Sequence, residues 1–151
     1  MEQFTCNSDA MAAGVEPYTH PLLERAYALM DEFGFPAPAG AERNAIPQAA
    51  LRGSRGPGAR DLAAAFQAYY MFRELHSANN RYPMGFKTLM GDYFFSLLAK
   101  LLVTLEDESG LDELFAKRLE RDCEADVRGD RDIGLGEYIA FVEAYRGGEP
   151  S

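Results

Sequence analysis

Two stretches of sequence decide the fold: LAAAFQAYYMFRELH over residues 62–76 and LMGDYFFSLLAKLLVTL over residues 89–105. In the first, apolar side chains point to nearly every side of a helix, which is typical of a helix that is buried or covered by a partner. In the second, the polar residues fall at every fourth position and form one narrow stripe, made of Asp92, Ser96, Lys100 and Thr104. We expect the second helix to be the most buried element.

Two helices are expected before these stretches. The first is predicted from Pro21 to about Phe33, with Thr19 as its N-cap, because proline fits the first turn and a hydroxyl can accept from free N–H groups. A shorter helix is predicted over residues 41–51, although Pro47 lacks the N–H that a helix interior uses.

The connection between the two long helices is also marked in the sequence. Asp61 is expected to cap the first of them, which then runs to about residue 78. Pro83 and Gly85 interrupt the chain after it. Gly91-Asp92 is expected to open the next helix, where an acidic residue in the first turn is favourable.

Two further helices are expected near the C-terminus, over residues 111–124 and 135–146. The whole pattern gives five or six helices and no credible strand pair. The predicted fold class is therefore all-α, a single helical domain over residues 15–147, with a flexible leader over 1–14 and a short tail over 148–151.

Composition narrows the possible partners. A chain of 151 residues suits one domain with a single core. The formal net charge of −9 and pI near 4.7 argue against a nucleic-acid partner, since phosphate binding needs clustered Lys and Arg. Cys6 and Cys123 lie far apart, which predicts reduced thiols and a cytoplasmic location. No stretch approaches the roughly 20 apolar residues that span a bilayer, so no transmembrane segment is expected.

The order of the motifs resembles the front half of a trans-polyprenyl diphosphate synthase. The resemblance rests on the alanine-rich helix that ends in Leu75-His76, the polar hinge after it, and the apolar helix that begins with Gly91-Asp92. A tail segment over residues 132–141 (DIGLGEYIAF) is also similar to a helix of that family. The resemblance covers about residues 60–142 and implies a truncated bundle of the isoprenoid-synthase type.

In that family the Leu-His pair runs into an aspartate-rich motif, whose carboxylates hold the Mg²⁺ ions that bind and ionise an allylic diphosphate. Here Ser77, Ala78 and Arg81 stand where the three aspartates are expected. Neutral and cationic side chains cannot replace carboxylate ligands. The resemblance therefore implies no catalytic residue, no metal ligand and no cofactor in this chain.

A short chain without these aspartates resembles the small subunit of heterodimeric hexaprenyl or heptaprenyl diphosphate synthases. The resemblance implies a non-catalytic regulatory subunit that stabilises a catalytic large subunit and helps to set product chain length. Mg²⁺ is expected in that large subunit. The product is expected to serve a quinone side chain, such as that of menaquinone, and any membrane contact is expected through the product alone.

Helices this apolar are hard to cover within a short chain, which favours contact with a partner subunit. The interface candidates are Tyr69, Tyr70, Phe72, His76, Phe94, Phe95 and Leu98, with Gly91 and Asp92 as residues of the family motif. His76 is expected to be structural, because the sequence places no nucleophile or carboxylate to complete a catalytic site around it. Arg73, Lys87 and Arg81 are expected to be ordinary surface charges.

Two alternatives stay open. One is an unrelated helical interaction protein that forms a homodimer through the same apolar faces. The other is a degenerate EF-hand-like calcium module over residues 126–137, with acids at loop positions 1, 5, 7 and 12. Arg128 and Arg131 occupy positions 3 and 6, where such a loop requires an oxygen ligand and a glycine, so this alternative is the weaker one.

Overall fold

The computed structural model describes residues 17–52, 56, 58–77, 82–105, 110–129 and 134–146, with the backbone alone of Arg146. This part of the chain is all-α and contains no strand, as the sequence predicts. Its helices are α2 (Pro21–Glu32), α3 (Ala41–Leu51), α4 (Ala59–Leu75), α5 (Met84–Thr104), α6 (Leu111–Arg128) and α7 (Leu135–Arg146). The predicted leader over 1–14 and tail over 148–151 lie outside the described residues.

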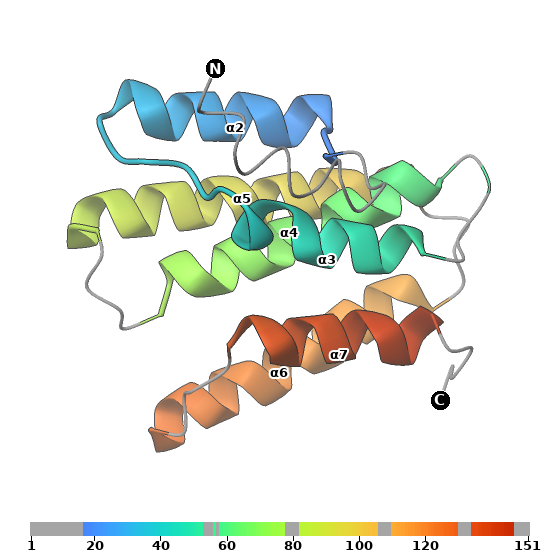
Figure 1. The fold of residues 1–151 in the computed structure, drawn as a ribbon. Coiled ribbons are helices and arrows are strands. Elements are labelled where there is room, and N and C mark those ends of the chain that lie inside the picture. The colour runs from blue at the N-terminus through green and yellow to red at the C-terminus, as the bar shows by residue number, and fades with distance from the viewer. Residues whose placement is uncertain are drawn as a thin grey trace.

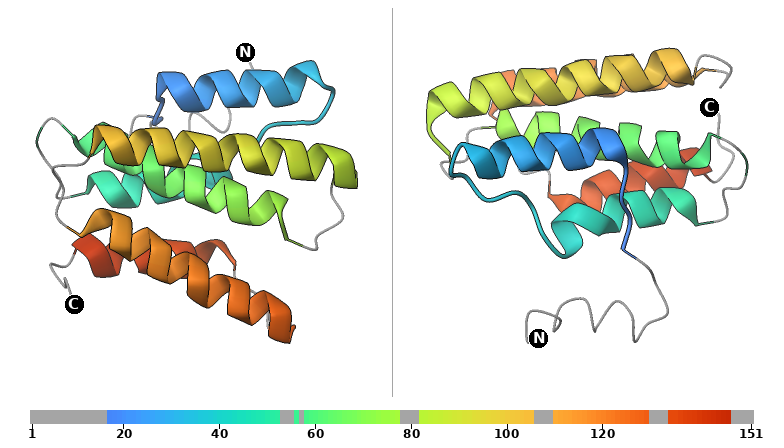
Figure 2. Two further views of the ribbon diagram at one scale, coloured as in Figure 1. Left: turned by 180° about the vertical axis from the view of Figure 1, so that it is seen from behind. Right: turned by 90° about the horizontal axis from the view of Figure 1, so that it is seen from above.

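Helix α4 lies at the centre of the bundle. Helix α5 packs antiparallel to α4 on one side, and α3 packs on the other (Figures 1 and 2). Helix α2 lies against α5, and α7 lies against α3, so that α2 and the α6–α7 pair are at opposite ends of the molecule. Every described helix therefore covers α4 directly or covers a neighbour of α4.

The composition of α4 explains its central position. Its alanines, Ala63, Ala64, Ala65 and Ala68, are fully buried and small enough to let neighbouring backbones approach closely. Between them, Phe66 and Tyr69 make ring contacts with Phe115 of α6 and Phe141 of α7, and fill the wider space on that side. Small and large residues on different faces thus set different helix spacings around one axis.

The expectation that α5 is the most buried element is wrong. Thirteen of the 17 residues of α4 are buried, against seven of the 21 residues of α5. The polar stripe of α5 is exposed, and so are apolar residues beside it, since Leu89 is 72% exposed and Val103 is 70% exposed. Helix α5 is apolar on nearly every side, but only one side packs against α4, while another side faces solvent.

Helix α5 also begins earlier than predicted. It starts at Met84 with Pro83 as its N-cap residue, so Gly91-Asp92 lies about two turns inside the helix instead of opening it. Pro83 favours this start: it occupies the N-cap position with extended backbone (φ −63°, ψ 152°), and its missing N–H removes no hydrogen bond within the helix.

Helix α2 is confirmed within one residue, but its predicted cap is wrong. The N-cap is His20, whose Nδ1 accepts from the backbone N–H of Leu22 at 3.2 Å. The Nε2 atom of His20 lies 2.7 Å from Oδ1 of Asp61. Asp61 is therefore not the cap of α4, which begins two residues earlier at Ala59, but a tie between the first turn of α4 and the start of α2.

Helices α3 and α7 have their predicted bounds, and α6 is one turn longer than expected. Pro47 is tolerated inside α3 because it is buried with Ile46 against α4, so that packing outweighs the lost hydrogen bond. Helix α6 continues past Glu124 to Arg128 and stops at Gly129, which has a φ of 83° and supplies the left-handed residue that ends many helices.

Two further expectations concern the surroundings of the protein. Among the described residues, none of the helices combines the length and the apolar composition that crossing a bilayer requires. Cys123 is a free, exposed thiol on α6, and Cys6 lies outside the described residues.

Phe94 and Phe95 offer a matched test of this packing. Phe94 has no exposed surface and lies with its ring 6.1 Å from that of Tyr27 on α2, whereas Phe95 is 42% exposed. We expect Phe94→Ala to lower the free energy of unfolding by about 3–5 kcal/mol because it leaves a cavity. Phe95→Ala is expected to cost about 1 kcal/mol. Urea denaturation of both variants measures the difference, and equal losses would contradict the orientation of α5.

Candidate functional site

The two halves of the sequence motif meet in space at the turn between α4 and α5. His76 is the C-cap residue of α4, and its ring lies against Gly91 of α5. A Cβ atom at position 91 would overlap the imidazole ring, so any residue larger than glycine would displace it. We call Phe72, His76, Gly91, Asp92 and Phe95 the His76 corner.

The other members of the corner hold the ring in place. Nε2 of His76 lies 3.3 Å from Oδ1 of Asp92, and its ring centroid lies 4.9 Å from that of Phe72. Phe72 in turn contacts Phe95, with ring centroids 5.0 Å apart. The pair of His76 and Asp92 stands at the surface, with side chains 31% and 65% exposed, where an ion pair contributes about 1 kcal/mol or less. Packing over Gly91 therefore positions His76 more firmly than charge does.

The chemistry available at this corner is limited. It brings together one imidazole and one carboxylate, whereas a magnesium site needs several oxygen ligands. Ser77, the next residue after the Leu-His pair, donates its hydroxyl to the carbonyl of Glu74 at 2.8 Å. No group of three or more His, Cys, Asp or Glu residues in the described part of the chain is placed to hold a metal ion. Ala78 and Arg81 lie outside the described residues. The described donors of the corner do not fit Mg²⁺.

Most of the predicted interface residues are closed inside the chain. Tyr69, Tyr70, Phe72, Phe94 and Leu98 are all buried within the single chain, because α2, α3, α6 and α7 cover the faces that the sequence left open. In the single chain these five side chains offer little surface to a partner, and their place in an interface stays a prediction. His76 and Phe95 do reach the surface, together with Asp92.

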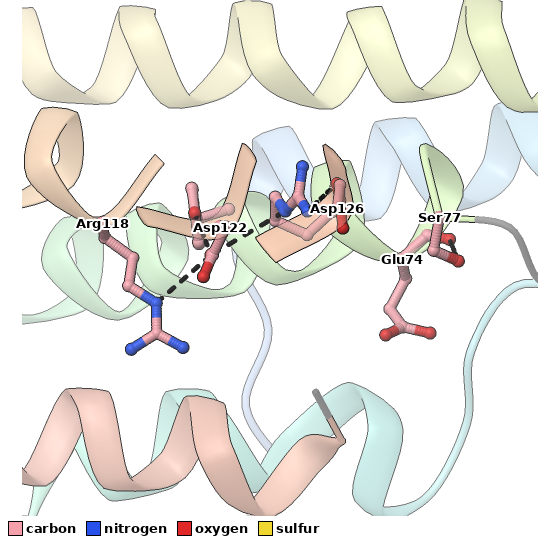
Figure 3. A network of polar contacts seen from close by, with 7 residues as sticks. Glu74, Ser77, Arg118, Asp122 and Asp126 are labelled. Atoms are coloured by element: carbon pink, nitrogen blue, oxygen red, sulfur yellow. Dashed lines mark hydrogen bonds and ion pairs between the residues drawn. The ribbon is translucent and has the colours of Figure 1, made fainter. Parts of the chain in front are cut away.

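A second polar cluster lies between α4 and α6. We call it the buried charge cluster; Arg118, Asp122 and Asp126 project from α6, as Figure 3 shows, and Arg73 and Tyr69 approach from α4. Oδ2 of Asp122 accepts from the Tyr69 hydroxyl at 2.5 Å and from Nε of Arg118 at 3.2 Å. Asp126 accepts from Nη2 of Arg73 at 2.5 Å.

The cluster is charge-balanced but not fully hydrogen-bonded. Its two arginines and two aspartates sum to zero, and the side chains of Arg73, Arg118 and Asp122 are at least nine-tenths buried. Within the described part of the chain, Nη2 of Arg118 and Oδ1 of Asp122 have no hydrogen-bond partner. Buried groups left in this way cost stability, so the cluster is better suited to fixing how α6 docks than to strengthening the fold.

The cluster shifts the ionisation of its neighbours. Burial raises the pKa of Tyr69, and the hydrogen bond to Asp122 raises it further. Burial also raises the pKa of Tyr138, with the negative charge of Asp122 acting in the same direction. For Arg73, burial works to lower the pKa, but the hydrogen bond to Asp126 and the charge of that carboxylate outweigh it, so the pKa lies above its ordinary value. Both tyrosines stay neutral and Arg73 stays charged at neutral pH.

This cluster is not predicted from the sequence. Arg73 and Lys87 are predicted to be surface charges, yet both are buried. A signal was present in α6, where Arg118 and Asp122 continue the i, i+4, i+7, i+11 spacing that starts with the buried Leu111 and Phe115. Charged residues at positions that an amphipathic helix normally fills with apolar ones indicate a buried ionic cluster.

The weaker alternative, a calcium loop over residues 126–137, is not supported at its first position. Asp126 through Arg128 form the last turn of α6, and Asp126 is ion-paired with Arg73 at 2.5 Å. A ligand at loop position 1 would have to leave both the helix and this pair. Residues 130–133 lie outside the described residues.

Comparison of the chain with known protein families, with curated proteins and with solved structures found no match.

The close contact at the His76 corner predicts a coupled response to substitution. In a chain that carries His76→Ala, Gly91→Ala is expected to stabilise α5 by about 1 kcal/mol, because alanine is the better helix former. In the unaltered chain that gain is expected to vanish or reverse, because the new methyl group displaces the ring from Phe72 and Asp92. Thermal or urea unfolding of the four chains of this double-mutant cycle measures the coupling. The same effect of Gly91→Ala in both backgrounds would contradict the contact.

The buried charge cluster predicts a large cost for removing one charge. Asp122→Asn leaves Arg118 and Arg73 without their shared carboxylate and is expected to lower the free energy of unfolding by about 3–5 kcal/mol. Glu124→Gln, on the same helix but 63% exposed, is the matched control and is expected to cost about 0.5 kcal/mol or less. Urea denaturation measures both. A small effect of Asp122→Asn would show that water reaches the cluster.

Proposed function

We propose that this chain is a non-catalytic helical subunit that acts by pairing with another protein, and that its partner is the catalytic large subunit of a trans-polyprenyl diphosphate synthase. The observation that carries the proposal is the His76 corner. Leu75-His76 and Gly91-Asp92 are the residues on which the family resemblance rests, and the fold brings them together across the α4–α5 turn.

The His76 corner supports the proposal because it gives His76, Gly91 and Asp92 a structural role, the positioning of α4 against α5, that does not require catalysis. Glycine at position 91 is required by the ring of His76, and Oδ1 of Asp92 lies 3.3 Å from Nε2 of that ring. A framework can keep such a contact after losing its metal ligands, since the contact positions two helices and binds nothing itself. The serine that follows His76 is engaged with its own helix.

In this proposal the chemistry belongs to the partner. The large subunit holds Mg²⁺ and condenses isopentenyl diphosphate with an allylic diphosphate in the cytoplasm, giving a prenyl chain for a quinone. The chain described here contributes stability to that subunit and helps to set the length of its product. The buried state of Tyr69, Tyr70 and Phe94 means that the role does not depend on the partner covering these residues.

A second candidate is favoured by that same closed core. A chain that covers its own aromatic residues has less need of an obligate partner, which suits a self-contained helical interaction protein that forms homodimers. The two candidates differ in what the chain binds, and one experiment separates them.

The test is affinity capture with the tagged full-length chain from its native lysate, followed by assay. We expect capture of a protein with two aspartate-rich motifs, and incorporation of labelled isopentenyl diphosphate into a longer prenyl diphosphate by the purified pair with Mg²⁺. The chain alone is the matched control and is expected to be inactive. Activity of the chain alone would overturn the non-catalytic role, and capture of only the chain itself would favour the second candidate.

A further inference from the structure

The exposed side of α5 carries a pattern that neither the core nor the His76 corner explains. We define the α5 outer face by seven of the exposed residues of α5, namely Thr88, Leu89, Asp92, Ser96, Lys100, Val103 and Thr104; Met84, Gly85, Phe95 and Ala99 are also exposed but are not part of the pattern. Leu89 and Val103, two of the large apolar side chains that the described chain leaves most open to solvent, lie near its two ends. One acid and one base lie between them.

The seven residues of this face are placed symmetrically in the sequence about Ser96. Leu89 lies seven residues before Ser96 and Val103 seven after it. Asp92 lies four residues before and Lys100 four after it, with opposite charges. Thr88 and Thr104 follow the same rule at eight residues. Among these seven residues the pattern is symmetric in apolar and hydroxyl groups and antisymmetric in charge, whereas exposed Phe95 and Ala99 have no exposed counterpart.

That arrangement is what two antiparallel copies of one helix require. A two-fold axis through Ser96 places each residue beside the one equally far on the other side of Ser96 in the second copy. Leu89 then meets Val103 of the second copy, and Asp92 meets its Lys100, twice over. Packed helices lie about 8–10 Å apart, depending on the side chains at their contact. Ser96 and Ala99 are small and exposed, so they allow two helices to approach closely at the centre of this contact.

We infer that the α5 outer face is a contact between two copies of this chain, packed antiparallel about Ser96. Charge favours a second copy over other occupants. The chain carries −9, so two copies repel each other over most of their surfaces, whereas Asp92 and Lys100 cancel on this face. Lys100 has no ion pair with any described residue, and Asp92 has only His76. The inference does not rest on the proposed function.

The first experiment measures self-association of the full chain by sedimentation velocity over a range of concentrations. We expect a dimer in the wild type. Asp92→Lys and Lys100→Asp each place like charges in both cross-pairs, and each is expected to weaken the dimer roughly tenfold or more. When these two variants are mixed, the two lysines on the face of the first meet the two aspartates on the face of the second. The mixture is therefore expected to associate as strongly as the wild type. Circular dichroism checks that each variant is folded.

The second experiment tests the register. In a chain with Cys6→Ser and Cys123→Ser, we expect Ser96→Cys to form an intermolecular disulfide under mild oxidation, while Ala116→Cys, exposed on α6, does not. Leu89→Glu is expected to abolish the dimer. A wild-type chain that stays monomeric at every concentration overturns the inference, whether or not the face then binds vesicles or another protein. Equal self-association of the wild type and both charge variants excludes the antiparallel register.

Discussion

Helix α4 is enclosed on all sides, and each described element takes its place from the face of α4 that it covers. Alanines on two of these faces let α3 and α5 approach closely, while Phe66 and Tyr69 hold α6 and α7 further away. The wider space must then be filled by aromatic rings from both sides. The ring contacts of Phe115 and Phe141 do this, and they explain why the C-terminal pair of helices is rich in large side chains on its inner face.

An aromatic interface of this kind is strong but imprecise, because rings tolerate sliding and tilting against one another. The buried charge cluster supplies the positional specificity that the ring contacts lack. Asp122 reaches the Tyr69 hydroxyl of α4 in one position of α6 alone, and Asp126 meets Arg73 of α4 one turn further along, whereas the contact between Asp122 and Arg118 lies within α6. Burying the three charged groups Arg73, Arg118 and Asp122 is costly unless they meet in good geometry, so displacement of α6 by a turn is penalised. The cluster therefore serves to fix the register of α6 on α4.

The helices were predictable because their signals are local. Bounds of α3 and α7 follow from periodicity, and α6 was misjudged only where Gly129 ends it beyond the last apolar residue. Caps and tertiary contacts were less predictable, since His20 caps α2 partly through Asp61, 41 residues away. That the chain itself covers Tyr69 and Phe94, which were predicted to face a partner, was less predictable for a related reason. Periodicity shows that a helix is apolar on many sides, but only the arrangement of the other helices shows whether the same chain covers those sides.

Helix α5 shows that an apolar pattern in the sequence does not reveal which sides of a helix the chain itself covers. Its sequence gives one apolar signal, but the fold divides it between an inner side closed by α4 and α2 and an outer side open to solvent. Solubility alone would favour charged residues at Leu89 and Val103, since neither touches the core. Polar residues on this face occur only in a stripe, and the stripe has opposite charges equally far from a small residue. An apolar helix at the edge of a bundle, with its charges arranged in this way, has one packing surface inside the chain and a second, outer surface whose composition suits a helix–helix contact.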